Sequence, residues 1–260
     1  MAQWDIAEPR AAALIESLRA FGYTPETAVA DLVDNSVSAG AATIDIKFHW
    51  NGRQSFVAIV DDGRGMTETE LVNAMRPGSV SPLVERSQKD LGRFGLGLKT
   101  ASFSQARELT VQTRSAENTA MYVRRWDLDT VEQVNQWRLL REAPPSRVVP
   151  TVEAPTGTAI TWTKCDRLVG DVDPDDRRAQ DRFNATIDRI ANHLSVVFHR
   201  FLTGSAKIVM RVNGKPLRPW DPFLETHSAT QCLGTETLGF QGQRVLVTPY
   251  VLPHRDKLTD

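Results

Sequence analysis

The segment Asp31-Leu32-Val33-Asp34-Asn35 lies within a run of helical periodicity that ends before Gly40. Thr24-Pro25 marks its start, because threonine is a favoured N-cap and proline fits the first helical position. Asp31 and Asn35 are four residues apart, so they lie one turn apart on the same helix face. A carboxylate beside an amide oxygen can hold a water molecule and a hard cation. Taken alone, the pattern is better explained by a solvated polar face.

A second segment, Asp61-Asp62-Gly63-Arg64-Gly65-Met66, follows a predicted β-hairpin. Alternation predicts a strand over 44–50, Asn51-Gly52 predicts a two-residue turn, and 56–60 is the return strand. Asp61 then lies at a strand end, where glycines let the backbone approach a flat ligand closely. A carboxylate there can accept from an exocyclic amino group such as that of adenine. A plain strand-to-helix turn explains these residues equally well.

A third segment, residues 92–100, reads Gly-Arg-Phe-Gly-Leu-Gly-Leu-Lys-Thr and predicts a glycine-rich loop that enters a helix over 98–103. A Walker A loop needs lysine directly after the second glycine, whereas Leu98 intervenes here. A Rossmann loop needs a preceding strand, and residues 84–90 are polar. Free N–H groups at a helix start suit phosphate, with Lys99 in the first turn. The alternative is a flexible loop with a basic residue.

The remaining pattern favours an α/β layered fold with a mixed sheet. A polar, mostly acidic stretch over 170–181 indicates a domain boundary. The other expected elements are a helix over 11–21, a capping box at Thr67 and Glu70, strands over 108–113, 120–126, 131–139 and 158–163, a long helix over 187–201 and a strand over 208–212.

Composition limits the functional classes. The chain has 260 residues and a net charge of −1, so it has no global field that would draw it onto nucleic acid. Cys165 and Cys232 are isolated and form neither a metal-ligand spacing nor a disulfide framework. We see no signal peptide, and no apolar run approaches the ~20 residues that cross a bilayer. We therefore expect a cytoplasmic protein without membrane contact, and a chain that is a fragment of a longer one.

The three segments occur in this order at spacings of about 26 and about 31 residues. Together they resemble the N-box and two glycine boxes of the GHKL superfamily of gyrases, heat-shock chaperones, histidine kinases and MutL. Asp34-Asn35 and Gly-Leu-Gly-Leu-Lys-Thr-Ala-Ser over 95–102 most resemble its microrchidia (MORC) branch. The resemblance covers about residues 10–165. Residues 180–220 resemble, more weakly, the transducer domain that follows in some branches.

This resemblance implies the Bergerat fold, an α/β two-layer sandwich with a mixed, mostly antiparallel sheet and helices on one face. It implies an ATP-binding domain over 1–168, a linker over 169–179 and a transducer-like α/β domain over 180–260, which we expect to be truncated.

The resemblance also implies ATP as substrate and Mg²⁺ as its metal. Asn35 would ligate Mg²⁺, and Asp61 would accept from the adenine amino group, supported by Gly65 and Thr158. The second glycine box would wrap the phosphates, with Lys99 neutralising them. The implied nucleotide-binding residues are Asn35, Asp61, Gly63, Gly65, Met66, Gly92, Gly95, Gly97, Leu98, Lys99, Thr100 and Thr158.

Asp31 occupies the place of the family's general base, which is usually glutamate. The family also often has aspartate near the position of Ser38. The shorter carboxylate of Asp31 predicts slow hydrolysis, and it leaves open a second interpretation, a nucleotide-binding switch without hydrolysis. A histidine kinase catalytic domain is disfavoured, because the first histidine is His49 on a predicted strand. Five scattered histidines also disfavour another metal or hydrolytic enzyme.

In such relatives ATP orders a lid, here residues 76–97, and two protomers dimerise through N-terminal arms, here residues 1–10. We therefore expect ATP or ADP as ligand and an ATP-dependent homodimer. By analogy with MORC and MutL, we expect DNA or protein partners that bind through a missing C-terminal region. Arg86, Arg124 and Arg125 are candidate phosphate contacts, although scattered arginines are usually solvated.

Overall fold

A computed structural model of the chain describes residues 5, 9–20, 22–78, 97–145, 149–204, 207–240 and 242–258. Within these residues, seven strands form one sheet in the order β4-β3-β5-β2-β1-β6-β7. In chain order they are β1 (Thr43–His49), β2 (Phe56–Asp61), β3 (Glu108–Ser115), β4 (Asn118–Asp127), β5 (Gly157–Thr163), β6 (Val209–Val212) and β7 (Lys215–Pro216). The pairing of β1 with β6 is parallel, and the other pairings of this sheet are antiparallel. The predicted mixed, mostly antiparallel sheet is confirmed.

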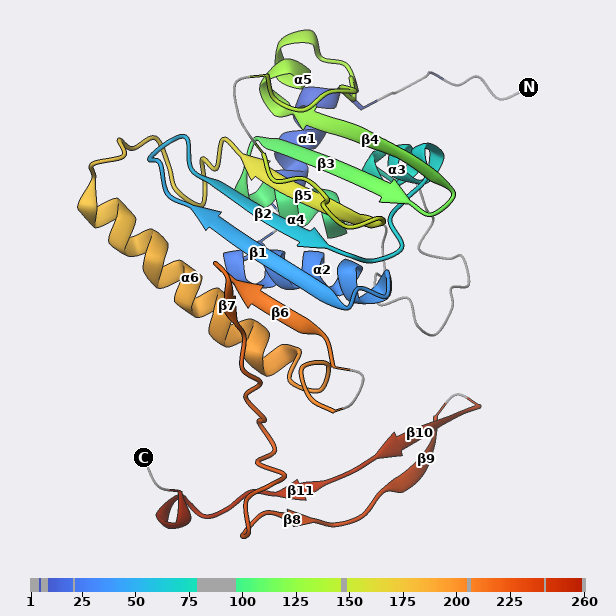
Figure 1. Cartoon of the computed structure of the whole chain (residues 1–260), viewed down its shortest axis with the longest axis vertical. Coiled ribbons are helices and arrows are strands. Elements are labelled where there is room, and N and C mark those ends of the chain that lie inside the picture. Colours follow the sequence, from blue (N-terminus) through green and yellow to red (C-terminus); the bar gives the residue numbers. More distant parts are fainter. Residues whose placement is uncertain are drawn as a thin grey trace.

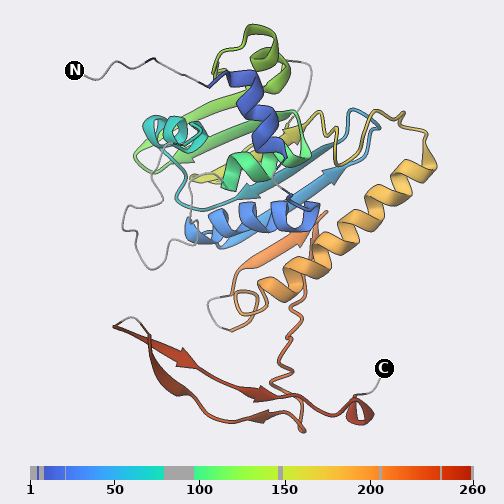
Figure 2. The same ribbon diagram turned by 180° about the vertical axis from the view of Figure 1, so that it is seen from behind.

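Helices cover one face of this sheet, as Figures 1 and 2 show from opposite sides. The covering helices are α1 (Ala11–Arg19), α2 (Pro25–Ser38), α4 (Gly97–Gln105) and α6 (Arg177–Val197). α4 packs against both α1 and α2, and α6 packs against α2. Two shorter helices, α3 (Glu68–Met75) and α5 (Leu128–Val134), contact β4 at the sheet edge. The result is the predicted two-layer α/β sandwich. None of the described helices has the length and hydropathy that a membrane-spanning helix needs.

The start of α2 follows from local chemistry. The Thr24 side chain accepts a hydrogen bond from the backbone N–H of Thr27, and Pro25 occupies the first turn. Leu32 and Val33 are fully buried in the common core with strands β1 and β2. Because this apolar side is packed against the sheet, Asn35 remains exposed, whereas the neighbouring Ser36 is buried.

The first hairpin differs from its prediction. Residues 50–55 connect β1 to β2, because the register pairs His49 with Phe56. The connection contains two successive turns, in which Gln54 N–H donates to Asn51 O and Ser55 N–H donates to Gly52 O. The two-residue turn predicted from Asn51-Gly52 is therefore wrong. Asn51 and Gly52 open a longer loop instead.

The strand predicted over 131–139 is also wrong, because α5 and a loop occupy these residues. The Asp127 side chain accepts from Asp129 N–H and caps the helix, and Asn135 ends it in the left-handed conformation at φ 50°. Leu128 and Val131 are buried at helical spacing. These two apolar residues therefore fit one helix face, and the Asp127 cap favours a helix over a strand here.

The later elements extend the same sheet. α6 begins well before the predicted residue 187, since the Asp176 side chain accepts from Ala179 N–H. Phe183 of α6 packs edge-on against Phe48 of β1, with ring centroids 6.1 Å apart. β6 continues the sheet beside β1 and returns through Asn213 and Gly214, both at positive φ. The division into domains at 169–179 stays a prediction, and the sheet runs across it.

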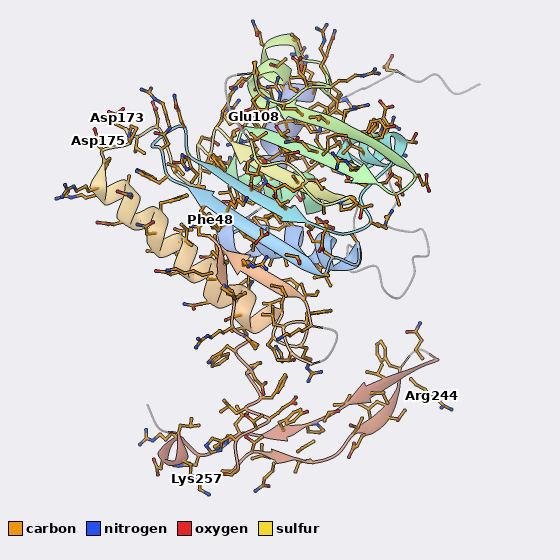
Figure 3. All side chains as sticks on the ribbon, in the orientation of Figure 1. Phe48, Glu108, Asp173, Asp175, Arg244 and Lys257 are labelled. Atoms are coloured by element: carbon orange, nitrogen blue, oxygen red, sulfur yellow. The ribbon has the colours of Figure 1, made fainter. Side chains whose placement is uncertain are left out.

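Beyond β7 the chain leaves the sandwich and forms a separate ribbon (Figure 1). It consists of β8 (Gln231–Cys232), β9 (Glu236–Phe240), β10 (Gln243–Val247), β11 (Tyr250–Val251) and a 3₁₀ turn over Arg255–Lys257. Figure 3 shows its side chains standing away from the rest of the protein, with Arg244 at the far end. Exposed apolar side chains on the ribbon include Leu238, Phe240 and Leu246.

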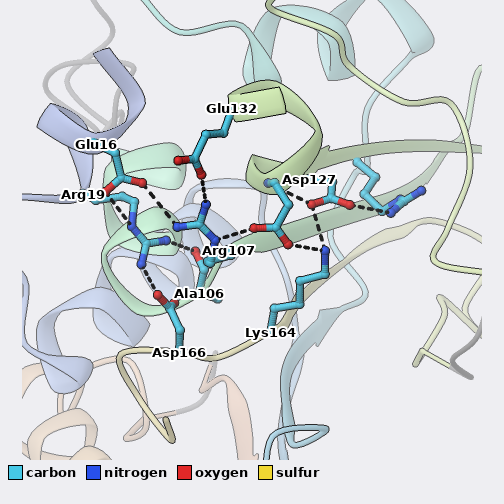
Figure 4. A network of polar contacts seen from close by, with 10 residues as sticks. Glu16, Arg19, Ala106, Arg107, Asp127, Glu132, Lys164 and Asp166 are labelled. Carbon is cyan, nitrogen blue, oxygen red and sulfur yellow. Dashed lines mark hydrogen bonds and ion pairs between the residues drawn. The ribbon is translucent and has the colours of Figure 1, made fainter. Parts of the chain in front are cut away.

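A polar network connects α1 to the residues just before β3, at the end of β4 and just after β5 (Figure 4). The buried Arg19 donates to Ala106 O at 3.0 Å and pairs with Asp166 at 2.5 Å. Arg107 pairs with Glu16, Asp129 and Glu132, and Lys164 pairs with Asp127 and Asp129. Since Ala106 and Arg107 follow the end of α4 directly, the network fixes where α4 meets the sheet.

Candidate functional site

The strand-end carboxylate of Asp61 is buried, with 5% of the residue exposed. Ser36 Oγ of α2 donates to its Oδ2 at 2.9 Å, and Gly63 N–H donates to its Oδ1 at 2.9 Å. Burial raises the pKa of Asp61 above its usual value of 3.8, and hydrogen bonds from Gly63, Ser36 and Thr158 partly offset that effect. A buried carboxylate with fixed oxygens can accept a hydrogen bond from a ligand with defined geometry.

The glycines around Asp61 are required by close backbone contacts. Gly65 has φ 65°, and a Cβ there would lie 1.9 Å from Arg114 O. Gly157 has φ 148°, and a Cβ there would lie 2.1 Å from Asp61 O. A Cβ on Gly63 would lie 2.9 Å from Asp61 Oδ1. At Gly65 and Gly157 the blocking atom is a backbone oxygen and φ is positive, so the turn after β2 packs against β3 and β5 only with glycine at these two positions.

A threonine pair supports this turn from the neighbouring strands. Thr113 Oγ1 accepts from Met66 N–H at 2.9 Å, donates to Gly157 O at 2.9 Å, and lies 3.1 Å from Thr158 Oγ1. Thr158 is paired with Asp61 across β2 and β5, and with Thr113 across β3 and β5. The predicted residues Asp61, Met66 and Thr158 are thus brought together.

Sequence reasoning missed Thr113 and Ser36 as members of this site. Ser36 follows Asn35 directly, so its place on α2 was a usable signal. Thr113 carried no local signal, because its role depends on the strand register that places β3 beside β5.

α2 presents the other carboxylate and the amide. Asn35 is exposed and Asp31 is half-buried. Asp31 Oδ2 accepts from the hydroxyl of Tyr23 at 2.6 Å, and lies 3.4 Å from where a Cβ on Gly97 would be. The start of α4 therefore lies beside Asp31. Asn35 has the amide oxygen that a hard cation prefers, and its exposure leaves that oxygen accessible.

α4 contains residues 97–100, the part of the glycine-rich segment 92–100 that the structure describes. Gly97 and Leu98 are half-buried at its start, and Thr100 is buried. Lys99 is also buried, with 1% exposed, and its Nζ donates to Ala74 O at the end of α3 at 2.8 Å. Burial lowers the pKa of Lys99 to about 8. The lysine thus contacts α3 in this structure, and its predicted role at the phosphates stays a prediction.

Several expected parts lie outside the described residues. They are Gly92 and Gly95, residues 79–96 of the expected lid, Arg86, and residues 1–4 and 6–8 of the expected N-terminal arm. Arg124 and Arg125 are described and are buried. Arg124 pairs with Glu68 at 2.5 Å, and Arg125 pairs with Glu108 at 2.6 Å. These arginines are neither solvated nor directed to a ligand, because each neutralises a carboxylate of the fold.

Three polar groups therefore lie on α2 and at the end of β2 that α2 contacts. They are a buried acceptor at Asp61, an exposed amide at Asn35, and a second carboxylate at Asp31 beside the start of α4. The hydrogen bond between Ser36 and Asp61 joins the helix of the last two to the strand of the first. This arrangement can bind a flat polar ring at Asp61 and a charged group near α4.

Comparison with known proteins agrees with this geometry. Residues 23–157, just over half of the chain, match the family described as histidine kinase-, DNA gyrase B-, and HSP90-like ATPase. The matched region includes α2, the turn after β2, α4 and the start of β5.

Individual relatives match a shorter region. The DNA mismatch repair protein MutL of Halobacterium salinarum is 39% identical over 92 residues, which are 35% of this chain and 14% of that protein. The ATPase morc-1 of Caenorhabditis elegans is 34% identical over 90 residues, 35% of this chain and 10% of that protein. MutL of Dictyoglomus turgidum is 26% identical over 118 residues, 44% of this chain and 20% of that protein. The alignments thus span a fifth or less of each relative.

Proposed function

The chain belongs to the family of histidine kinase-, DNA gyrase B- and HSP90-like ATPases, and from this premise we propose that it binds Mg-ATP and hydrolyses it slowly. The observation that carries this proposal is the buried Asp61 carboxylate, fixed by Ser36 and Gly63 at a strand end. A fixed buried acceptor is what selective binding of an amino-substituted ring requires, because an unpaired buried polar group is costly.

In this proposal Asp61 accepts from the adenine amino group, while Thr158 and the turn with Gly63, Gly65 and Met66 shape the ring pocket. Gly97, Leu98 and Thr100 at the start of α4 would contact the phosphates, as would Gly92, Gly95 and Lys99. Asn35 would hold Mg²⁺, because its amide oxygen is exposed on the helix between Asp31 and the adenine side. The ion would offset charge on the phosphate oxygens.

Asp31 is the proposed general base. It lies on α2 one turn before Asn35, and its Oδ2 lies close to Gly97 at the start of α4. From there its carboxylate can orient a water molecule toward the terminal phosphate and accept its proton. Aspartate is one methylene shorter than glutamate, so it reaches less far, and slow turnover is the expected consequence.

We place this reaction in a conformational switch that includes ATP-dependent self-association. MutL is named a DNA mismatch repair protein, and a DNA-linked process is the corresponding proposal for the longer protein. We propose that residues 1–168 form the ATP-binding unit and that 180–260 belong to a transducer-like unit, joined by 169–179.

The second candidate function is a switch that binds nucleotide without hydrolysis. The short side chain of Asp31 favours it, since binding depends on Asp61 and not on Asp31.

Calorimetry and a phosphate-release assay on the purified chain test both functions. The ATPase proposal expects Mg-ATP to bind more tightly than Mg-GTP, because guanine has a carbonyl where adenine has an amino group. It also expects slow phosphate release that stops when EDTA removes Mg²⁺. Binding without release would favour the switch, and equal binding of the two nucleotides would contradict the adenine assignment.

A further inference from the structure

Tyr23 lies at the junction of α2 and α4, just before the Thr24 cap. Its hydroxyl donates to Asp31 Oδ2 at 2.6 Å. Its backbone oxygen accepts from Nε2 of the buried Gln105 at the other end of α4 at 3.2 Å. Gln105 of α4 therefore holds the Tyr23 backbone while the Tyr23 hydroxyl contacts the carboxylate on α2.

We propose that Tyr23 is the positioning residue for Asp31, an inference that rests on the proposed ATPase function. Its hydroxyl holds Oδ2 in place, so Oδ1 is the oxygen that meets the attacking water. Through the hydrogen bond from Gln105, Tyr23 also ties the orientation of Asp31 to the helix that begins at Gly97.

The physical reason is the short reach of aspartate. An aspartate side chain without a fixed partner can change rotamer, and a carboxylate displaced by about 1 Å can lose on the order of a hundredfold in rate. One short hydrogen bond from a neutral donor removes that freedom, and a bond to a charged acceptor is stronger than one between neutral groups. A tyrosine also leaves the carboxylate its negative charge, which a lysine or arginine would neutralise.

The protonation of Tyr23 agrees with this role. Burial raises the pKa of Tyr23 above 10.0, and the hydrogen bond and charge of Asp31 raise it further, while Thr100 lowers it. Tyr23 therefore keeps its proton at neutral pH and acts as a donor, and Asp31 remains free to accept a proton from water.

The test compares Tyr23→Phe with a matched variant elsewhere in the chain. Tyr23→Phe removes only the hydroxyl and keeps the ring that packs against the core. Tyr250→Phe removes a hydroxyl that likewise donates to a carboxylate, that of Glu225 at 3.0 Å on the C-terminal ribbon. We expect Tyr23→Phe to lower kcat by about tenfold to a hundredfold, with KM for ATP within about twofold. Tyr250→Phe should match the wild type.

A double variant separates positioning from a general structural effect. In an Asp31→Ala background the hydroxyl has no carboxylate to hold, so adding Tyr23→Phe should change phosphate release by less than about twofold. A Tyr23→Phe chain that turns over at the wild-type rate or faster overturns the inference alone. The inference is also overturned if adding Tyr23→Phe to Asp31→Ala slows phosphate release by the same factor as Tyr23→Phe does in the wild type. A wild-type chain that binds ATP but releases no phosphate overturns the proposed hydrolysis itself, and the inference with it.

A second readout does not depend on activity. The chain has three tyrosines, so ¹³C labelling at the tyrosine Cζ gives three resonances, assigned with the two phenylalanine variants. At neutral pH the Tyr23 resonance should differ between the wild type and Asp31→Asn, because the substitution replaces the charged acceptor of the Tyr23 hydroxyl. A Tyr23 resonance with the same chemical shift in the wild type and in Asp31→Asn shows that the contact is absent.

Discussion

Ser36 on α2 donates a hydrogen bond of 2.9 Å to Asp61 Oδ2 at the end of β2. The two residues belong to different motifs of the sequence, a polar helix face and a strand-end glycine turn. Their contact sets the distance between the proposed adenine end and the proposed phosphate end of the site. Substitutions on either side of this contact should therefore have different consequences for binding and for hydrolysis.

Asp61→Asn should weaken ATP binding by at least about tenfold, because the amide presents a donor toward the adenine amino group and leaves a buried polar group unpaired. Asp62→Asn is the control. Among the described residues, the neighbouring Asp62 accepts from the backbone N–H groups of Ala42 and Thr43, at 2.8 Å each, so its substitution should preserve affinity. Calorimetry measures the affinity of both variants for ATP, and an unchanged affinity in Asp61→Asn contradicts the adenine assignment.

Asp31→Ala should leave ATP affinity largely intact while phosphate release drops, because the role of a general base is expressed in the transition state. Asp34→Ala is the matched control, since Asp34 points about 100° around the helix from Asn35. Asp31→Glu should speed hydrolysis where the pocket has room for the extra methylene. Steady-state phosphate release decides the assignment, and an Asp31→Ala chain as fast as the wild type refutes it.

Lys99 should take up a proton when ATP binds at a pH slightly above 8. In the free protein burial lowers the pKa of this lysine to about 8, so a large fraction is neutral at pH 8.5. A phosphate nearby favours the charged form and raises that pKa, so binding must be accompanied by proton uptake. Calorimetry in buffers of different ionisation enthalpy measures the uptake. Its persistence in Lys99→Met would place the protonated group elsewhere.

Gly65→Ala should destabilise the protein far more than Gly78→Ala. Both glycines have similar positive φ values, 65° and 68°, so the cost of that conformation is shared. A Cβ at Gly65 would lie 1.9 Å from Arg114 O, whereas one at Gly78 would meet no described atom within 4 Å. Thermal unfolding of the two variants isolates the clash, and equal melting temperatures contradict the close packing of this turn on β3.

The sequence alone determined the parts of the fold that depend on local chemistry. Thr24-Pro25 predicted the start of α2, the alternation from Ile44 predicted β1, and Thr67 with Glu70 predicted the capping box of α3, all of which the structure shows. Motif order and spacing further indicated the family that residues 23–157 match. These features were readable because caps, periodicity and glycine turns act between residues close in the chain.

Only the tertiary structure decided which distant groups meet. The strand predicted over 131–139 is helix and loop, because the Asp127 cap and the buried Leu128 and Val131 favour a helix there. The contacts of Tyr23 with Asp31 and Gln105, of Ser36 with Asp61, and of Lys99 with Ala74 join separate elements. Such contacts depend on strand register and on how helices pack, and neither is fixed by neighbours along the chain. Sequence therefore identified the carboxylates, and packing decided which partner holds each one.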